Sequence, residues 1–193
     1  MTGVQTCALP IYNTFLEILW TVIPTIILLV IAIPSFKLFY FSHYNPNTEM
    51  TLKAIGNQWY WTYEYPDFDD ISFYANMLAD HELSDPKLSL LETHTHIVLP
   101  LDKVVKLQLT SADVLHAWTI PAFGVKMDAV PGRLNETWFK ANKEGIYYGQ
   151  CSELCGPKHA FMPINVKVVS NKEFEEWIEF AKSEYASLEI NYS

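Results

Sequence analysis

Residues 150–163 read QCSELCGPKHAFMP and bring two cysteines, a histidine and a methionine into one short stretch. The chain has only three cysteines, and two of them, Cys151 and Cys155, lie here. Soft sulfur ligands suit Cu(I) and imidazole suits Cu(II), so a site that combines thiolate, imidazole and thioether favours copper among biological metals. Such a site holds copper in either oxidation state with little rearrangement. The stretch therefore predicts a copper centre suited to electron transfer.

The spacing of the two cysteines favours a pair of copper ions. A mononuclear blue-copper site uses one Cys, two His and a weak axial Met, whereas two thiolates on one loop can bridge two ions. Each ion then needs a terminal imidazole. His159 supplies one, and His116, in SADVLHAWTIP at the end of an expected strand, is the candidate for the other. The predicted ligands are His116, Cys151, Glu153 (backbone carbonyl), Cys155, His159 and Met162.

Other uses of the two cysteines fit the pattern less well. A disulfide between Cys151 and Cys155 would close a strained loop and leave His159 and Met162 unexplained. A structural zinc site takes Cys and His but not Met. An iron–sulfur cluster needs four ligands, usually cysteines, at other spacings. The CxxxC pattern alone is also compatible with two ordinary core cysteines. The whole pattern from His116 to Met162 is far more specific and favours the copper centre.

The composition limits the class of partner. The formal net charge is −9 and the pI is about 5.0, which excludes nucleic acid as the expected partner and suits a basic protein. Half of the 193 residues are hydrophobic, enough for an ordinary folded core.

A membrane-spanning helix is expected over residues 17–41. No charged residue occurs from Ile18 to Phe36, a run close to the length that crosses a bilayer. A buried core helix and a signal peptide are the alternatives. A signal peptide needs a basic start, and there is no Lys or Arg before residue 37. Residues 1–16 fit none of these patterns and are interpreted as an artefactual or truncated leader, with no role assigned to Cys7.

Short apolar runs separated by turns follow the polar linker of residues 42–50. Their alternation over residues 51–170 predicts an antiparallel β-sandwich or barrel. One of these runs, residues 89–101, would place His94 and His96 on one face of a strand. Residues 171–193 are expected to form a closing helix and tail, started by a capping box of Ser170 and Glu173. The helix face predicted to be apolar consists of Phe174, Trp177, Ile178, Ala181 and Tyr185.

Several segments resemble subunit 2 of the haem–copper cytochrome c oxidases. They are EILWTVIPTIILLVIAIPS, GNQWYWTYEY, DVLHAWTIPAFGVKMDAVPGRLNETWF and GIYYGQCSELCGPKHAFMPI, and the resemblance runs from about Glu17 to the closing helix. It implies a mainly β, cupredoxin-like Greek-key barrel or sandwich, preceded by a transmembrane helix and closed by a C-terminal helix. It also implies a dinuclear CuA centre at the six positions above, and a magnesium ion shared between the Glu153 side chain and subunit 1.

The resemblance implies a function as well. Such a chain accepts electrons from cytochrome c at the copper pair and passes them to haem in subunit 1, where oxygen is reduced to water and protons are pumped. It is a subunit of a proton-translocating oxidoreductase, with subunit 1, subunit 3, cytochrome c and the membrane as partners. Family members usually have two membrane helices, and the span here resembles the second, so the start is interpreted as incomplete.

Single residues acquire expected roles from the same resemblance. Trp59 is expected to admit electrons above the copper, and Trp61 to be a packing residue. Glu17 matches a glutamate near the mouth of a proton channel of subunit 1. The alternative is that Glu17 is an acid at the membrane surface without a role in proton transfer. Acidic residues expected to form the cytochrome c docking face are Glu64, Asp67, Asp69, Asp70, Asp113 and Asp128; an ordinary solvated surface is the alternative.

Two other functions and two locations stay open. A nitrous oxide reductase shares the copper-ligand pattern, but it would be a soluble enzyme with a second copper domain. A copper-delivery or assembly module would hold metal without relaying electrons, and would not need the WYW element of residues 59–61. The bacterial cytoplasmic membrane, with the copper domain in the periplasm, is favoured over the mitochondrial inner membrane, with the domain in the intermembrane space.

Overall fold

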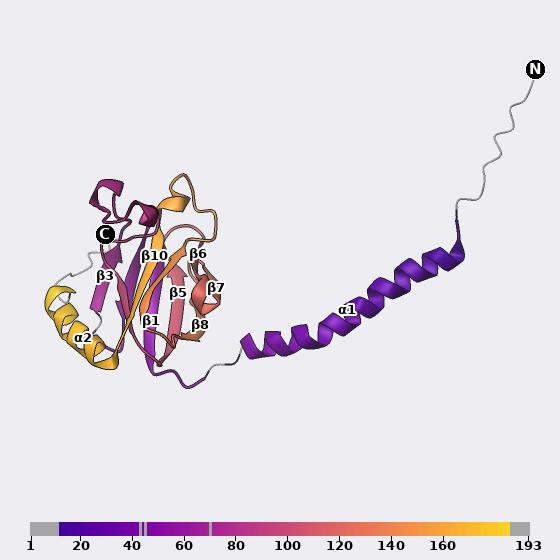
Figure 1. The fold of residues 1–193 in the computed structure, drawn as a ribbon, viewed down its shortest axis with the longest axis horizontal. Coiled ribbons are helices and arrows are strands. Elements are labelled where there is room, and N and C mark those ends of the chain that lie inside the picture. Colours follow the sequence, from indigo (N-terminus) through magenta and orange to yellow (C-terminus); the bar gives the residue numbers. More distant parts are fainter. Residues whose placement is uncertain (1–11, 43, 45, 70, 186–193) are drawn as a thin grey trace, which may run out of the picture. The chain divides into compact units, whose positions relative to one another are not determined.

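The computed structural model describes residues 12–42, 44, 46–69 and 71–185 (Figure 1). The first 11 residues of the predicted leader of residues 1–16, with Cys7, lie outside the described residues, as do the predicted docking residue Asp70 and the tail after residue 185. The last residues of that leader, from Thr14, belong to the first helix. The chain divides into two units, residues 1–44 and 45–193, and each is described by itself.

The first unit contains one long helix, α1, from Thr14 to Ser42. Its start is capped by Asn13, whose Oδ1 accepts a hydrogen bond from the backbone N–H of Leu16 at 3.3 Å. Within the 28 residues from Thr14 to Phe41, the most apolar window of 18 residues has a mean hydropathy of 2.5 and is not buried. At 1.5 Å per residue the 28 residues extend about 42 Å, more than the roughly 30 Å of a bilayer core. The helix is therefore long and apolar enough to span a membrane.

The second unit is a β domain. Its strands are β1 (Met50–Asn57), β2 (Tyr60–Tyr65), β3 (Ile71–Ala75), β4 (Ile97–Pro100), β5 (Val104–Ser111), β6 (His116–Ile120), β7 (Val125–Ala129), β8 (Asn135–Lys140), β9 (Gly145–Gln150) and β10 (Pro163–Val169). Short 3-10 turns are η1 (Asp80–Glu82), η2 (Pro86–Leu88), η3 (Pro121–Phe123) and η4 (His159–Phe161), and the closing helix is α2 (Asn171–Tyr185).

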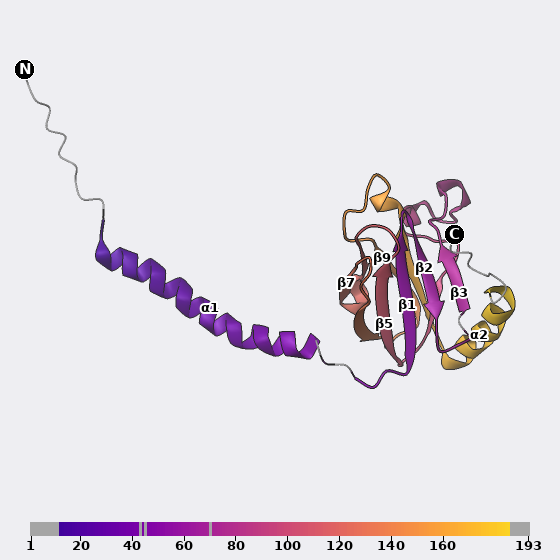
Figure 2. The same ribbon diagram turned by 180° about the vertical axis from the view of Figure 1, so that it is seen from behind.

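Two main sheets face each other. One has the strand order β3-β2-β1-β5-β8 and the other β4-β10-β9, while β6 and β7 form a separate pair (Figure 2). Most neighbours are antiparallel, as expected, but β1 pairs with β5 and β4 pairs with β10 in parallel. The antiparallel pairing expected from the sequence does not hold at these two pairs. Alternation along a strand predicts which side chains face the core, but not the direction of the neighbouring strand.

The core lies between the two main sheets. Buried and partly exposed residues alternate without interruption along β1 and β5, and their inward side chains Leu52 and Leu107 are fully buried. Ile164 and Val166 of β10 are likewise fully buried. The predicted mainly β domain is thus confirmed, and its core is contained within residues 45–193.

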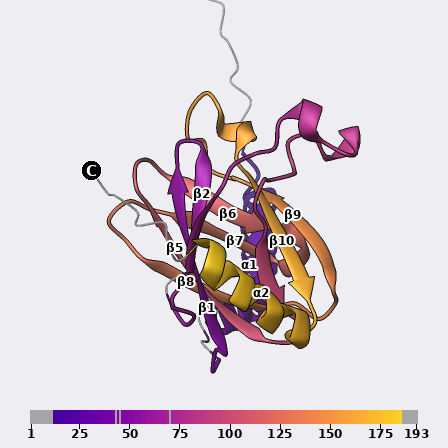
Figure 3. The same ribbon diagram turned by 90° about the vertical axis from the view of Figure 1, so that its left-hand side faces the viewer.

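Helix α2 covers one side of the sandwich, beside β3 and β4 (Figure 3). The predicted capping box is present, because Ser170 N–H donates to Glu173 Oε2 at 3.2 Å and Glu173 N–H donates to Ser170 Oγ at 3.3 Å. Phe174, Ile178 and Ala181 are buried, as their spacing predicted, and Trp177 packs against the core.

The strand expected over residues 89–101 is much shorter than predicted. Only Ile97–Pro100 is a strand, and His94 and His96 lie before it in a loop. Glu92 explains the difference, because its carboxylate is turned inward. It lies 2.7 Å from His96 Nε2 and accepts a hydrogen bond from the amide of buried Asn165. A single antiparallel β-bridge between Met77 and Thr93 and these side-chain contacts hold the segment, in place of the expected strand.

Tyr65 joins the two sheets through one buried hydroxyl. Its Oη donates to the Val98 carbonyl and accepts from the Val98 N–H, both at 3.0 Å. Tyr65 belongs to β2 and Val98 to β4, and the Tyr65 side chain is fully buried. The hydroxyl therefore satisfies the hydrogen-bonding needs of both backbone polar groups of Val98, its N–H and its carbonyl, on the unpaired edge of β4.

We expect Tyr65→Phe to lower the free energy of unfolding of residues 45–193 by about 1–3 kcal/mol, because it strands a buried donor and a buried acceptor. Tyr74→Phe, on the exposed side of β3, is the matched control and should change stability little. Urea denaturation measures both. Equal losses in the two variants would contradict the assigned role of the Tyr65 hydroxyl.

Candidate metal centre

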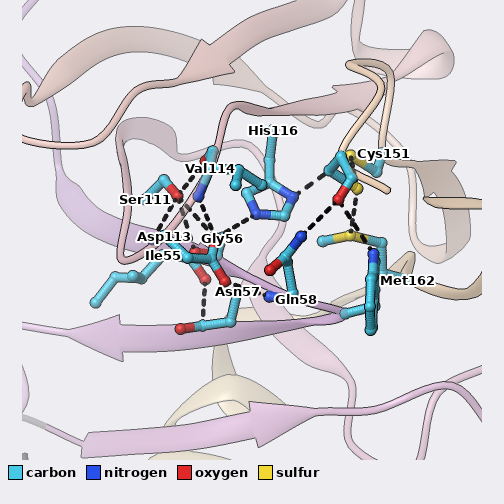
Figure 4. A network of polar contacts seen from close by, with 12 residues as sticks. Ile55, Gly56, Asn57, Gln58, Ser111, Asp113, Val114, His116, Cys151 and Met162 are labelled. Carbon is cyan, nitrogen blue, oxygen red and sulfur yellow. Dashed lines mark hydrogen bonds and ion pairs between the residues drawn. The ribbon is translucent and has the colours of Figure 1, made fainter. Parts of the chain in front are cut away.

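Three segments meet at one end of the β domain around the predicted copper ligands. They are the turn between β1 and β2, the loop of residues 112–115 that leads into His116, and the loop between β9 and β10. The backbone N–H of Ser152 donates to the Ala117 carbonyl at 3.0 Å, which ties the cysteine loop to β6. Figure 4 shows the polar contacts that join these segments.

His116 is the first residue of β6, not the last residue of a strand as expected from sequence, and it is fully buried. Its ring packs directly on Gly56, where an added Cβ would lie only 2.7 Å from ring atom Cδ2. Trp61 lies edge-on at 5.9 Å between ring centroids. Nε2 lies 2.8 Å from Oδ1 of Asp113, and Nδ1 faces Cys151 Sγ at 3.9 Å. The imidazole is therefore held with Nδ1 toward the cysteines.

The two cysteines are free thiols whose sulfur atoms lie 4.0 Å apart. Cys151 Sγ is 3.4 Å from the Glu153 carbonyl oxygen. Cys155 Sγ is 3.4 Å from His159 Nδ1 and 3.6 Å from Met162 Sδ. Every predicted ligand atom is thus within 4.0 Å of at least one of the two sulfurs.

This donor set fits a soft metal centre. A metal ion about 2.0–2.3 Å from each of two donors requires those donors to lie within about 4.6 Å of each other, and each neighbouring pair above meets that limit. The ligand atoms of His116, Cys151 and Cys155 all lie within 4.8 Å of one another. The site combines sulfur and imidazole without a carboxylate oxygen among the close donors, which is the chemistry that copper prefers.

The electrostatics of the metal-free site also favour a cation. Burial disfavours the Cys151 thiolate, but the hydrogen bond with His116 and two backbone groups lower the pKa of Cys151 to about 7. Burial and the neighbouring Cys151 raise the pKa of Cys155 to about 12. For His116, burial is outweighed by the contacts to Cys151 and Asp113, which raise its pKa. The site holds one thiolate easily, and a second needs added positive charge.

Trp59 lies against the cysteine loop and is partly buried. Its indole N–H donates to the Cys155 carbonyl at 3.3 Å, and the Gln58 side-chain amide donates to the same oxygen at 2.9 Å. The Lys158 ammonium lies 5.8 Å from the centre of the indole ring. Trp61 is fully buried and is a packing residue, as expected.

The structure separates the acidic residues predicted for docking into two groups. Asp113 and Asp128 lie near His116, since Asp128 pairs with Ala117 in the β6–β7 ladder. Asp67 lies at the other end of β1, where its carboxylate contacts the backbone N–H of Thr51. Thr51 is six residues, or about 20 Å along the strand, from Asn57, which precedes the turn at the site. At this second end, Asp69 pairs with Lys182 at 2.9 Å, while Glu64 pairs with Lys53 at 2.7 Å.

Sequence reasoning missed two residues that position the site. Gly56 gives space to the His116 ring, and Gln58 holds the Cys155 carbonyl. Both lie about 100 residues before the cysteines in the chain, so no local spacing reveals them. In the folded domain the end of β1 lies beside His116 and the cysteine loop, which brings both residues to the site.

The comparisons with known proteins agree with this geometry. A family model described as cytochrome c oxidase subunit II, periplasmic domain, matches residues 50–169, and one for the transmembrane domain of that subunit matches residues 4–38. A probable cytochrome c oxidase subunit 2 of Rickettsia felis is 48% identical over 167 residues, or 86% of this chain and 53% of the relative. Cytochrome c oxidase subunit 2 of Drosophila subobscura is 48% identical over 168 residues, or 87% and 73%.

Among solved structures, the periplasmic domain of subunit II of cytochrome oxidase from Bradyrhizobium japonicum is 53% identical, with a TM-score of 0.68. The match covers 72% of this chain and 98% of that domain, which was crystallised by itself. In this chain residues 45–193 form a compact unit with a hydrophobic core of its own.

Fold and site together define a membrane protein with a cupredoxin-like domain that carries a candidate metal site rich in sulfur and imidazole. The chain belongs to the cytochrome c oxidase subunit II family. It spans about half the length of the Rickettsia felis relative that it matches. The resemblance seen in the sequence is confirmed, and so is the predicted fold class.

We expect the affinity of residues 45–193 for Cu(I) to fall as the pH is lowered. Above the raised pKa of His116 the ion displaces roughly one proton, from Cys155, whose pKa is about 12. Below the Cys151 pKa of about 7 a second thiol proton must also leave, so the fall becomes steeper. Competition with a chromophoric Cu(I) chelator measures the slope.

Cys155→Ser is the control for this titration, because it removes the thiol of raised pKa. Its affinity should be nearly independent of pH above the pKa values of Cys151 and His116. A wild-type affinity that is flat across the same range would contradict the assigned protonation of Cys155.

Proposed function

We propose that this chain is the subunit of a cytochrome c oxidase that accepts electrons from cytochrome c and passes them to haem in subunit 1. There oxygen is reduced to water and protons are translocated. The observation that carries the proposal is the cluster of His116, Cys151 and Cys155 in a chain of the subunit II family. The expected six ligands are all within reach of the two sulfurs.

The proposed cofactor is a pair of copper ions, which supplies a one-electron carrier when bound. Cys151 and Cys155 would bridge the pair, with His116 and His159 as terminal ligands. Met162 and the Glu153 carbonyl would be the weaker ligands. We further propose that the Glu153 side chain holds a magnesium ion shared with subunit 1.

Trp59 is proposed to admit electrons. Its indole N–H contacts the Cys155 carbonyl, so one hydrogen bond separates the indole from a ligand residue. A reduced cytochrome c docked beside Trp59 would have a short route to the centre. The chain's net charge of −9 favours a basic partner. Asp128, exposed near His116, is the best placed of the predicted docking acids, whereas Glu64, Asp67 and Asp69 would act only at long range.

The membrane helix is proposed to anchor the chain beside subunit 1, with subunit 3 in the same complex. Glu17, in the first turn of α1, is proposed to lie near the mouth of a proton channel of subunit 1. Relatives are both bacterial and animal. We propose the bacterial cytoplasmic membrane with the copper domain in the periplasm, ahead of the mitochondrial inner membrane.

The test is electron paramagnetic resonance of residues 45–193 loaded with copper, together with metal analysis. The proposal expects hyperfine splitting by two equivalent copper nuclei and two coppers per chain. A signal from a single copper nucleus would overturn the dinuclear centre. A chain that keeps metal but is not reduced by cytochrome c would instead support the copper-delivery function. The family match favours the oxidase subunit over that module and over a nitrous oxide reductase domain.

We expect Trp59→Phe to slow reduction of the copper-loaded domain by cytochrome c by about tenfold or more, equivalent to a barrier increase of about 1.4 kcal/mol. The copper spectrum should be retained, because Trp59 is not a ligand. Stopped-flow mixing measures the rate. Trp138→Phe, on edge strand β8, is the matched control and should react like the wild type. Similar rates in all three proteins would exclude the role of Trp59.

A further inference from the structure

We propose that Lys158 makes the surface around Trp59 selective for a cytochrome that brings a carboxylate to this point. The inference deepens the proposed function and rests on it where cytochrome c is concerned. It adds a local requirement to the net charge of −9, which favours a partner that is basic as a whole. Lys158 is thus a residue that determines specificity, next to the side chain proposed to admit electrons.

A hollow of about 530 Å³ opens beside Trp59. Its walls come from three segments at the same end of the β domain: the turn between β1 and β2, the loop after β3 and the loop between β9 and β10 (Figure 1). The apolar part of the wall consists of Trp59, Tyr60, Met77 and Phe161. Phe161 is 45% exposed although it is a large apolar side chain. Exposed apolar surface in a hollow is typical of a place where another protein docks.

Lys158 carries the only formal charge among the described residues that line this hollow, since the others are apolar, aromatic or neutral polar. Its ammonium lies 5.8 Å from the centre of the Trp59 ring, within the range of a cation–π contact. In the described part of the chain no carboxylate pairs with this ammonium, whereas Lys53 and Lys103 each pair with one at 2.7 Å. The charge of Lys158 is therefore available to a docked partner.

The backbone that carries Lys158 is held by the loop of the metal site. The N–H of the next residue, His159, donates to the Gly156 carbonyl at 3.1 Å, and the Lys158 carbonyl accepts from the Phe161 N–H at 2.9 Å. The Trp59 ring packs on Gly156, where an added Cβ would lie 3.1 Å from ring atom Cζ2. The lysine and the indole are thus attached to the same short loop, so a partner that touches Trp59 also meets the ammonium.

A cation in the middle of a contact with a basic protein has a definite electrostatic effect. A lysine of the partner placed there is repelled, whereas a carboxylate is attracted and neutralises the ammonium as water leaves the interface. Two unit charges about 6 Å apart change a binding constant by about threefold in water, and by more where water is excluded. The net charge of the chain steers a basic partner from a distance, and Lys158 selects the side chain that lies over Trp59.

The first test measures the sign of the local charge without copper or cytochrome c. Metal-free residues 45–193 are titrated with iodide and with caesium, which quench tryptophan fluorescence, and the difference from the matching Trp59→Phe protein isolates the Trp59 signal. Lys158→Glu should reduce quenching of Trp59 by iodide and increase quenching by caesium. Lys158→Arg keeps the charge and should behave as the wild type. Lys143→Glu is the matched control, because Lys143 is exposed at the opposite end of β9.

The second test is a charge swap with the copper-loaded domain. One probe is a lysine-rich cytochrome c, and the others are the same cytochrome with single lysines beside its exposed haem edge replaced in turn by glutamate. With the lysine-rich cytochrome, Lys158→Glu should speed reduction at low salt by about threefold or more. With at least one glutamate variant, Lys158→Glu should slow reduction by a similar factor. Both differences should shrink as salt is raised.

Opposite responses to the two kinds of probe report the contact itself, because a change in the copper potential would move both rates in the same direction. The proposal is overturned if Lys158→Glu and Lys143→Glu have equal effects with every probe, which would make Lys158 an ordinary solvated lysine. It is also overturned if Lys158→Glu slows the lysine-rich cytochrome at low salt. If the domain takes up no copper pair, the proposed function fails, while the expected quenching result would still support the charge assigned beside Trp59.

Discussion

The site depends on the approach of two buried sulfur atoms, Cys151 and Cys155, to 4.0 Å without a disulfide. Burial raises the pKa of Cys155, and repulsion by the neighbouring Cys151 thiolate raises it further in the metal-free chain. A soft cation between them removes the repulsion and displaces the proton. The arrangement is thus unfavourable as a pair of anions and favourable as a ligand pair, which explains why the loop needs support from the rest of the domain.

That support comes from elements far apart in the sequence. Strand β1 supplies Gly56, on which the His116 ring rests, and the turn after it supplies Gln58 and Trp59, which hold the Cys155 carbonyl. Strand β6 supplies His116 and also the Ala117 carbonyl that fixes the cysteine loop. Few of the site's backbone and side-chain positions are therefore free to relax when metal binds or changes oxidation state. A rigid donor set of this kind suits an electron carrier, whose geometry should change little between its two states.

Much of this could be predicted from the sequence, because the signals were local. The Cys–Cys–His–Met spacing lies on one loop, the apolar run of α1 is continuous, and the capping box of Ser170 and Glu173 spans one turn. The misplaced features were those set by contacts across the fold. The parallel pairing of β1 with β5 has no signature in either strand, and the strand expected over residues 89–101 is shortened by the inward-facing Glu92. Asp113 is exposed, as expected of a surface acid, but the hydrogen bond that it accepts from the Gln58 N–H, 55 residues away, could not be predicted.

The central claim is that the two cysteine sulfurs bridge a pair of metal ions. X-ray absorption of the copper-loaded domain at the copper edge tests it most directly. The account predicts that each copper has two sulfur neighbours and a second copper at short distance, in both oxidation states. Copper with one sulfur neighbour and no second copper, or a disulfide between Cys151 and Cys155 with copper bound elsewhere, would contradict it.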